Sequence, residues 1–557
     1  MKESAMKERA SGRASSAVYL LGGKGQPARL GSVDEMGFKA SNLAAMASAG
    51  LPVPQGFVLS TGFCRDYEAT GGRAPANLRE VLAEGIRHIE RESALVFGGR
   101  RKPLLVSVRS GAPVSMPGMM ETVLDVGVND ETVQAMVRAT GNPRLAWDCY
   151  RRLVQSFAEV VHDCPPAPFE ARLARCLDDC GAVSTQEIDF RSLSALTHDF
   201  LSLFEEQTGA PFPQDPMTQL EAAALAVFRS WRSPRAASYR RAQGLDDAMG
   251  TAVTIQRMVF GNAGGMSGAG VAFTRDPSTG ENTLYMDFLF NAQGEDVVAG
   301  RRTVGAEPPL GRLLPEAVDH LERVARILES RFQDAQEFEF TIEDGVLYLL
   351  QTRTAKCTPW AALRIAVEQV DAGLIEPQQA LARLASIDLD SVQQTDFEDP
   401  QSIENLASAT PAGLGIASGR IALDASTAVR WAATGDDVVL VRDEAATSDI
   451  EGIAASRGVL TAVGGRTAHA AVVARQLGKV CLVGCSELAI DMAARRCRVG
   501  RRAFAEGDWV CLDANEGRVL AGRPALVVRR PSEWLRRVED WKATLRETAQ
   551  PVAQALA

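Results

Sequence analysis

The sequence has no apolar run that approaches the length of a membrane span, and the apolar stretch near its N-terminus, residues 17–21, is too short for a signal-peptide core. It also lacks Cys-x-x-Cys pairs: the 10 cysteines are scattered, and no histidine stands beside them at zinc-ligand spacing. These absences exclude membrane-spanning and zinc-finger classes, and they indicate a cytoplasmic protein with reduced thiols.

An excess of positive charge is also missing. The formal net charge is −10, so the overall balance gives no sign of the basic face that a nucleic-acid partner needs. Hydrophobic residues make up 46% and charged residues 23%, which is ordinary for a soluble globular protein. We therefore expect a soluble acidic enzyme with neither a nucleic acid nor a membrane as its partner.

The length of 557 residues predicts three or four folding units at roughly 150 residues each. Helical spacing dominates residues 130–245, strand-like runs dominate 250–355, and no short-period repeat is present. We expect an α/β (α+β) protein made of a large domain, a flexible joint and a small α/β domain. The predicted divisions are a disordered leader at 1–16, a large domain at 17–387 with a helical subdomain at about 130–245, a polar linker at 388–404, a small domain at 405–525 and a helical tail at 526–557.

A glycine-rich segment with a single histidine, residues 464–478, carries the strongest chemical signal. Two glycines end the preceding strand, Thr467 is a good helix N-cap, and Gly478 suits the left-handed position that ends a helix. The segment thus predicts a helix over residues 468–477.

His469 would lie in the first turn of that helix. There the exposed N–H groups and the helix dipole favour an anion and disfavour imidazolium, so the imidazole stays neutral and nucleophilic. A lone histidine at a helix start is more often a surface or capping group. This one stands in a long motif, Gly-Gly-x-Thr-x-His-Ala-Ala-Val-Val-Ala-Arg.

That motif resembles the phosphohistidine domain of pyruvate phosphate dikinase and phosphoenolpyruvate synthase. The resemblance implies that His469 carries a phosphoryl group, with Arg466 and Thr467 beside it as catalytic residues. Three further segments are similar to the ATP-grasp nucleotide-binding domain of the same family, and together the resemblance covers roughly residues 18–525.

The first of these segments, residues 36–46, centres on Lys39. The family usually has glycines on both sides of this lysine, where this sequence has Phe38 and Ala40. A lysine at this place meets phosphate oxygens as a point charge.

The second segment is an apolar strand that ends at Arg109 and is followed by a Met-Pro-Gly-Met-Met loop that ends at Met120. The planar guanidinium of Arg109 is suited to clamp a phosphate. The resemblance extends through the loop and implies that Arg109 and Met120 contact ATP.

The third segment, residues 259–277, is a glycine-rich loop between two strand-like runs. Its glycines let backbone N–H groups approach phosphates closely, and the resemblance places it as the lid loop over ATP. Further on, the family usually has glutamate where this sequence has Asp287. The aspartate keeps the negative charge, but its shorter side chain reaches less far towards the ribose. The residues of this part that we expect to bind ATP are Gly264, Gly265, Ser267, Gly268 and Asp287.

Two alternating strands supply a candidate metal site. Glu337 and Glu339 share one strand face, and Gln351 and Arg353 share one face of the returning strand. A two-residue turn would oppose these two faces, whereas a three-residue turn, residues 343–345, would unite them, so we predict the latter with Gly345 in the left-handed position.

Oxygen ligands from two carboxylates suit Mg²⁺ that bridges ATP phosphates. The predicted metal ligands are Glu337, Glu339 and Gln351, and the predicted ATP contacts in this hairpin are Glu339, Gln351 and Arg353. The alternative is a solvated strand face. The family usually has aspartate at the position of Glu337.

The resemblance implies an ATP-dependent phosphotransferase that phosphorylates His469 with Mg-ATP, releases AMP and passes the phosphoryl group to an acceptor. Nothing after residue 528 resembles the family's barrel domain that binds pyruvate or phosphoenolpyruvate, so we expect the acceptor to be an unknown small molecule or to sit on a separate acceptor-domain protein. Whether phosphate or water takes the γ-phosphoryl group is open.

Two other readings stand beside this one. In the second reading, the chain is a self-contained kinase for a small molecule other than pyruvate. In the third, it is a non-catalytic phosphocarrier or nucleotide-sensing module. An inactive enzyme would be expected to lose some of its functional residues, and this sequence keeps all six: Lys39, Arg109, Glu339, Gln351, Arg353 and His469.

Overall fold

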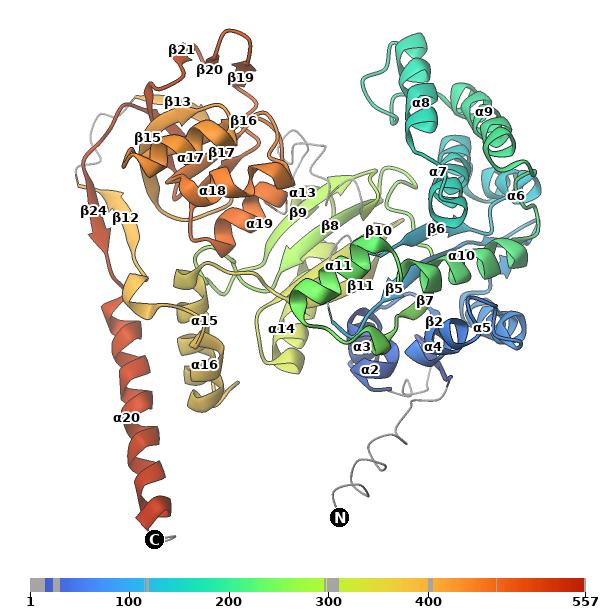
Figure 1. Ribbon diagram of the computed structural model, residues 1–557, viewed down its shortest axis with the longest axis horizontal. Coiled ribbons are helices and arrows are strands. Elements are labelled where there is room, and N and C mark those ends of the chain that lie inside the picture. The colour runs from blue at the N-terminus through green and yellow to red at the C-terminus, as the bar shows by residue number, and fades with distance from the viewer. Residues whose placement is uncertain are drawn as a thin grey trace. The chain divides into compact units, whose positions relative to one another are not determined.

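The computed structural model describes residues 16–23, 31–114, 116, 120–294, 297, 310–398, 404–466 and 468–554. The chain divides into two compact units, Met1–Gly265 with Ile342–Thr352, and Met266–Thr341 with Arg353–Ala557. Each unit mixes helices and strands, which confirms the predicted α/β class (Figure 1). Across the described ranges, no helix has the length and apolarity needed to cross a bilayer. None of the ten cysteines forms a disulfide.

An antiparallel five-stranded sheet organises the first unit, in the order β1-β2-β7-β5-β6. Helix α5 (Leu78–Ser93) packs on β2, and α10 (Pro216–Ser230) packs on β5, β6 and β7. The central strands are almost wholly buried as a result. The strand bounds are β1 Val18–Leu21, β2 Gly56–Leu59, β5 Val106–Gly111, β6 Thr122–Val126 and β7 Ala252–Arg257.

The helical segment predicted for residues 130–245 consists of six helices in the structure. Side chains of Asn129, Asn142, Asp189 and Asp215 accept hydrogen bonds from the first-turn N–H groups, so the sequence itself sets where several helices begin. Besides α10, the helices are α6 Asp130–Thr140, α7 Pro143–His162, α8 Ala167–Cys180, α9 Phe190–Thr208 and α11 Pro234–Gln243.

One buried ion pair lies on α7. Asp148 accepts from Arg151 at 2.9 Å and from Arg152 at 2.9 Å, and the Asp148 side chain is 3% exposed. Burial alone would raise the pKa of this carboxyl, but the charges of Arg152 and Arg151 and the hydrogen bond from Arg151 outweigh burial and lower it.

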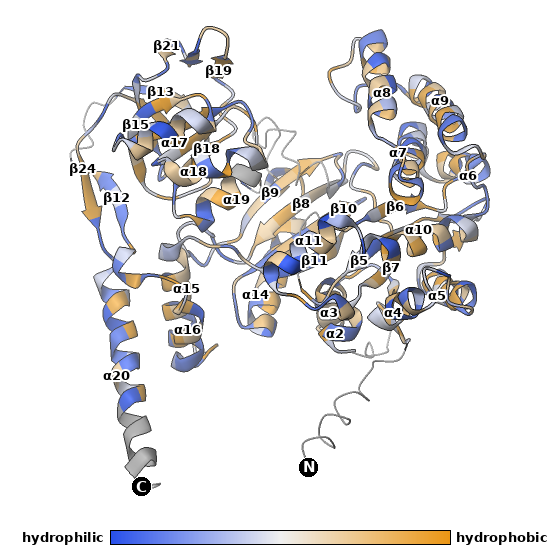
Figure 2. Ribbon diagram, in the orientation of Figure 1, coloured by the Kyte–Doolittle hydropathy of each residue, from blue (hydrophilic) through white to orange (hydrophobic). Residues whose placement is uncertain are grey.

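The second unit begins with the antiparallel pair β8 (Gly268–Phe273) and β9 (Tyr285–Phe290), which belong to a four-stranded sheet in the order β11-β10-β8-β9. Figure 2 shows both strands as mostly hydrophobic. Arg275, just after β8, pairs at 2.8 Å with Glu329 of α14 (Pro315–Phe332) and at 2.5 Å with Glu368 of α15 (Pro359–Asp371).

The hairpin of β10 (Gln336–Glu343) and β11 (Val346–Thr354) turns at two residues, so the predicted three-residue turn is wrong. Asp344 and Gly345 have φ of 48° and 81°, the left-handed pair of a type I′ turn, whose twist matches that of the flanking strands. Burial along β11 changes phase between Leu349 and Thr352, which are both buried. The strand alternation is therefore interrupted before Arg353.

The C-terminal part of the second unit contains an eight-stranded sheet in the order β13-β23-β22-β15-β16-β17-β18-β14. The strands β15 (Ile416–Ala422), β16 (Val438–Arg442), β17 (Gly458–Thr461) and β18 (Val480–Val483) run parallel. Helices α17 (Ala425–Ala433), α18 (Ile450–Ala455) and α19 (His469–Gln476) connect them. The remaining strands of this sheet are β13 Asn405–Ser408, β14 Thr410–Pro411, β22 Trp509–Asp513 and β23 Arg518–Ala521.

The chain segments on either side of this sheet pair with each other. Strand β12 (Gln394–Phe397) lies within the predicted linker, 388–404, and pairs antiparallel with β24 (Leu526–Arg529). The linker is thus partly a strand, and its residues 399–403 lie outside the described ones. The predicted tail helix is α20 (Ser532–Gln554), which packs on α15. The predicted domain boundaries stay predictions.

We expect Asp148→Asn to lower the free energy of unfolding by about 3 kcal/mol, because it leaves the buried Arg151 without its partner. The exposed pair of Glu84 and Arg87 provides the control. Glu84→Gln should change the free energy of unfolding by less than about 0.5 kcal/mol. Urea unfolding measures both.

The pH dependence gives a second readout of the same variant. A carboxyl with a lowered pKa stabilises the fold above the pKa of the unfolded chain, about 4, and loses that contribution as the pH falls further. The gap between wild type and Asp148→Asn should therefore narrow in acid. If Asp148→Asn and Glu84→Gln lowered the free energy of unfolding equally at neutral pH, the buried ion pair would not be the stabilising contact.

Candidate functional site

The histidine segment follows the carboxyl end of β17, in the parallel part of the eight-stranded sheet. Helix α19 starts at His469, so the predicted placement of this residue in the first helical turn is confirmed. The N-cap is Ala468 rather than Thr467, because Ala468 is still extended with ψ of 155°. Thr467 itself lies outside the described residues. Gly478 has φ of 61°, the predicted left-handed stop.

Arg475 of α19 holds the loop that leads into the helix. Its guanidinium is 1% exposed, and Nη1 donates to the backbone carbonyl of Arg466 at 2.7 Å. The same guanidinium lies 5.4 Å from the ring centre of Phe273 on β8. A buried guanidinium depends on the partners that it has, and the Nε of Arg475 finds none among the described residues. The bond from Nη1 therefore fixes the main chain at Arg466. Arg475 is the last residue of the histidine motif, and its position in the sequence gave no sign of this role.

The side chain of Arg466 points to β9. Its guanidinium lies 4.2 Å from the ring centre of Tyr285, whose hydroxyl donates to the carbonyl of Pro411 at 3.0 Å. Burial raises the pKa of the Tyr285 hydroxyl, so it stays protonated and acts as a donor. Tyr285 therefore contacts both the histidine loop and β14.

Asp287 stands two residues after Tyr285 on β9, so both side chains leave the same face of the strand. Asp287 is buried, and its charge acts on the Tyr285 hydroxyl. Within the second unit, Arg466 of the histidine loop thus contacts β9 at Tyr285, two residues before Asp287, the residue predicted to meet the ribose.

The glycine-rich loop supplies residues to both units. Gly264, with φ of 149°, and Gly265 have open space where a Cβ would stand. Gly268, at the start of β8, is packed: its Cβ would lie 2.1 Å from the ring of Phe288 and 2.6 Å from the carbonyl of Leu289. Ser267 is fully buried, and its carbonyl accepts from the N–H of Asn291 at 2.9 Å. The loop thus has an open tip and a fixed base.

Two carboxylates of β10 and one arginine form the charged end of the hairpin. Arg353 Nη2 donates to Glu337 Oε1 at 2.5 Å, so the shifted strand alternation still brings these two to one face. Burial would lower the pKa of Arg353, but the hydrogen bond and charge of Glu337 and the charge of Glu339 raise it. In the described part of the chain, no three His, Cys, Asp or Glu side chains gather to hold a metal alone. Two carboxylate ligands fit Mg²⁺, which takes its other oxygens from phosphates and water.

Lys39 is the second residue of α3 (Phe38–Ser48) and is exposed. The helix begins directly on the end of β5: Gly37 has φ of 76°, and a Cβ there would lie 2.0 Å from the carbonyl oxygen of Gly111. The N–H of Phe38 donates to the carbonyl of Ala112 at 2.9 Å. Only glycine permits this approach, which fixes Lys39 beside the strand of Arg109.

The same helix is tied to β11. Asn42 Nδ2 donates to the carbonyl of Thr352 at 2.8 Å, next to Gln351. Arg109, half-buried, stands opposite Thr254 in the sheet. Three predicted ATP contacts of the first unit, Lys39, Arg109 and Gln351, thus come from elements that α3 joins.

Met120 is half-buried against the core of the first unit, whereas residues 117–119 of its loop lie outside the described residues.

Glu343 is a positioning residue that the sequence analysis did not single out. It accepts from Arg257 at 3.2 Å and from the N–H of Phe260 at 3.0 Å, where the glycine-rich loop begins. Burial raises the pKa of Glu343, against the lowering effects of Arg257 and the Phe260 N–H. The sequence predicted Glu343 as the first residue of the hairpin turn, and nothing near it in the sequence indicated Arg257 or Phe260 as partners.

Gly37 and Gly50 provide a matched test, because both have φ of 76° and stand at the two ends of α3. Gly50→Ala has open space around it and should cost about 1 kcal/mol of unfolding free energy from the backbone alone. Gly37→Ala adds the clash with Gly111 and should cost about 1–3 kcal/mol more, measured by chemical unfolding. Equal costs would show that the helix does not depend on this contact.

Two family models match parts of this chain. The family model "Pyruvate phosphate dikinase, AMP/ATP-binding domain" matches residues 71–306, and "PEP-utilising enzyme, mobile domain" matches residues 434–517. The second match contains the whole histidine segment.

Curated relatives agree with these matches. The chain is 44% identical over 495 residues to pyruvate, phosphate dikinase 1 of Oryza sativa, which covers 88% of this chain and 52% of the relative. It is 43% identical over 491 residues to pyruvate, phosphate dikinase of Clostridium symbiosum, with 87% and 56% covered, and 40% identical over 565 residues to that of Rhizobium meliloti, with 97% and 62% covered. The chain thus spans about half to three fifths of the length of these relatives. With an AMP/ATP-binding domain and a mobile phosphohistidine domain in one chain, this protein belongs to the pyruvate phosphate dikinase family.

Proposed function

We propose that this protein is an ATP-dependent phosphotransferase of the dikinase type that phosphorylates its own His469 and releases AMP. The observation that carries the proposal is the contact of the histidine loop with β9. Arg466 packs on Tyr285, and the side chain of Asp287 leaves the same face of that strand. The nucleotide-binding part would have the ATP-grasp fold that its segments resemble.

The first step follows from the AMP product. A ring nitrogen of neutral His469 attacks the β-phosphorus of ATP, and the bond from that phosphorus to the α–β bridging oxygen breaks, so AMP leaves with the oxygen. The γ-phosphoryl group of the resulting pyrophosphohistidine then passes to phosphate or water and leaves phosphohistidine. The N-terminus of α19 suits this intermediate, because its backbone N–H groups favour an anion.

Residues from several segments of the chain would bind ATP. Lys39, Arg109, Arg353 and the N–H groups of the glycine-rich loop would meet the phosphates, Met120 the phosphates or the adenine, and Asp287 the ribose. Glu337 and Glu339 would hold Mg²⁺, which neutralises phosphate charge when bound. The two-residue turn removes the argument that placed Gln351 beside them as a third ligand. The ion pair between Arg353 and Glu337 supports this arrangement, since it already places a cation beside the carboxylates.

The acceptor would be a small molecule or a domain on a separate protein, reached by movement of the mobile domain. The paired strands β12 and β24 support such a movement, because the chain enters and leaves the domain through them side by side. Two strands joined by four residue pairs would act as one hinge.

Incubation with Mg-ATP, with and without phosphate, tests the function. We expect AMP as the nucleotide product and an acid-labile phosphoryl group on His469 that His469→Ala abolishes. Adding pyruvate to the isolated phosphoprotein then tests that acceptor. ADP as the only nucleotide product would support a simple kinase or ATPase, and labelling of His469→Ala would refute the carrier role.

Tyr285 provides a graded test of the contact with the histidine loop. Tyr285→Phe removes the hydrogen bond to Pro411 and should slow phosphorylation of His469 by about fivefold, from about 1 kcal/mol. Tyr285→Leu also removes the ring under Arg466 and should slow it further, by up to about 30-fold, from about 2 kcal/mol.

Rapid-quench labelling measures these rates, and ATP binding by both variants is the control. A Tyr285→Leu protein that is labelled as fast as wild type would show that transfer does not use this contact.

A further inference from the structure

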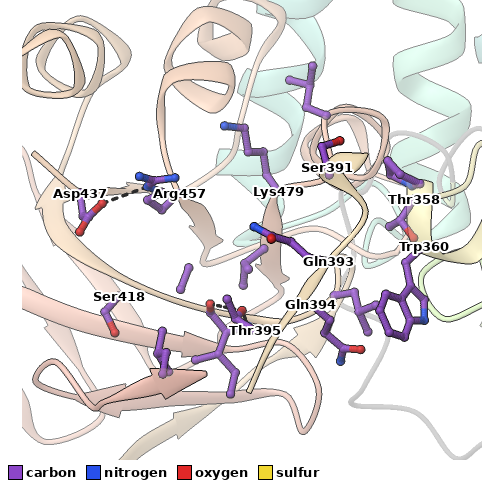
Figure 3. A pocket seen from close by; sticks show the side chains of 18 of the residues that line it. Thr358, Trp360, Ser391, Gln393, Gln394, Thr395, Ser418, Asp437, Arg457 and Lys479 are labelled. Carbon is purple, nitrogen blue, oxygen red and sulfur yellow. Dashed lines mark hydrogen bonds and ion pairs between the residues drawn. The ribbon is translucent and has the colours of Figure 1, made fainter. Parts of the chain in front are cut away.

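A cavity of about 660 Å³ lies within the second unit, between the mobile domain and the segments that connect it (Figure 3). Its walls come from the start of α15, the residues around β12, the start of β15, the end of α19 and the segment before β24. This volume is in the range of about 300–1,000 Å³ that small-molecule sites occupy. None of the residues proposed above to bind ATP or Mg²⁺, or to transfer the phosphoryl group, lines it.

Three cations and one carboxylate line the cavity. Arg457 Nε donates to Asp437 Oδ1 at 3.0 Å, and Arg523 Nη2 lies 3.3 Å from Asp437 Oδ2, so the single carboxylate is shared by two arginines. Lys479 adds a third positive charge, and Figure 3 shows it on the same side as Arg457 and Asp437. The lining thus carries an excess of two positive charges.

Lys479 is half-buried, and its ammonium has no hydrogen-bond or ion-pair partner among the residues the structure describes. Burial lowers the pKa of its ammonium, and the charge of Arg457 lowers it further. The ammonium thus loses hydration and meets the like charge of Arg457, and an anion in the cavity would offset both effects.

The remaining walls suit the organic part of a ligand. Trp360 gives an aromatic surface on the side of the cavity opposite Asp437, and Leu477 adds an apolar one. The amide of Gln393, an exposed residue, offers further hydrogen bonds. Cations at one side and an indole at the other select an anion that is larger than inorganic phosphate.

We propose that this cavity binds a small organic anion, a phosphate or carboxylate compound, whose charged group contacts Lys479 and Arg457 and whose organic part packs on Trp360. The guanidinium and the ammonium would form charge-assisted hydrogen bonds to its oxygens. The ligand would contact the mobile domain through Lys479 and the connecting segment through Gln393, so its binding would hold the two together. This last consequence rests on the movement proposed above, whereas the binding itself does not.

Amine acylation followed by mass spectrometry tests the site directly, because the chain has only 8 lysines. The protein is labelled without Mg²⁺, with phenyl phosphate, citrate or chloride at equal ionic strength. We expect phenyl phosphate and citrate to slow labelling of Lys479 by about tenfold or more, with labelling of Lys102 and Lys542 unchanged. Protection by one probe alone would assign the class of anion.

Arg457→Gln is the informative variant, since it keeps Lys479 as the reporter. It should raise the concentration for half-protection by about tenfold, and Arg100→Gln, which alters an exposed pair with Glu131, should leave it unchanged. Lys479 labelling that neither probe slows, or that Arg457→Gln leaves equally protected, would overturn the proposal. The readout needs no phosphotransfer, so its failure and a failure of the proposed function are separable.

Discussion

The hydrogen bond from buried Arg475 to the carbonyl of Arg466 is the constraint on which the histidine segment depends. A guanidinium with 1% exposure has lost its hydration, and the protein must replace it with fixed partners. The carbonyl of Arg466 and the ring of Phe273 are two such partners. Moving the loop away would leave the guanidinium with fewer partners in a medium of low polarity. The loop before His469 is therefore held by the cost of leaving an arginine unsatisfied.

The first unit uses a different constraint for the same purpose. Lys39 has a long and flexible side chain, but its backbone is placed by the contact of Gly37 with Gly111, at a distance that excludes any side chain. Phosphate recognition by a lysine depends on where its main chain starts, because the side chain then reaches oxygens as a point charge. Here the residue before Lys39, Phe38, donates its N–H to the carbonyl of Ala112, directly after β5.

Much of the histidine segment could be predicted from the sequence, since long motifs and helix start and stop signals act locally. The stop at Gly478 and the first-turn position of His469 follow from residues within a few positions of each other. The hairpin turn was misjudged because the three-residue turn was chosen to bring the polar residues of two regularly alternating strands to one face. The alternation of β11 is interrupted before Arg353, so Arg353 reaches Glu337 across a two-residue turn. The roles of Arg475 and Glu343 depend on partners such as Phe273 and Arg257, far away in sequence, and no local pattern shows such pairs.

Helix α19 connects the two sites of the second unit that we have described. Its eight residues span about 12 Å, with His469 at the N-terminal end and Lys479 three residues beyond the C-terminal end. The dipole of the helix favours an anion at the first end and disfavours one at the second, so an anion in the cavity depends on the charges of Lys479 and Arg457. A ligand there that held the mobile domain in one position would shift the equilibrium of His469 phosphorylation. Because coupling between two equilibria is reciprocal, phosphorylation of His469 would then change the affinity of the cavity by the same factor.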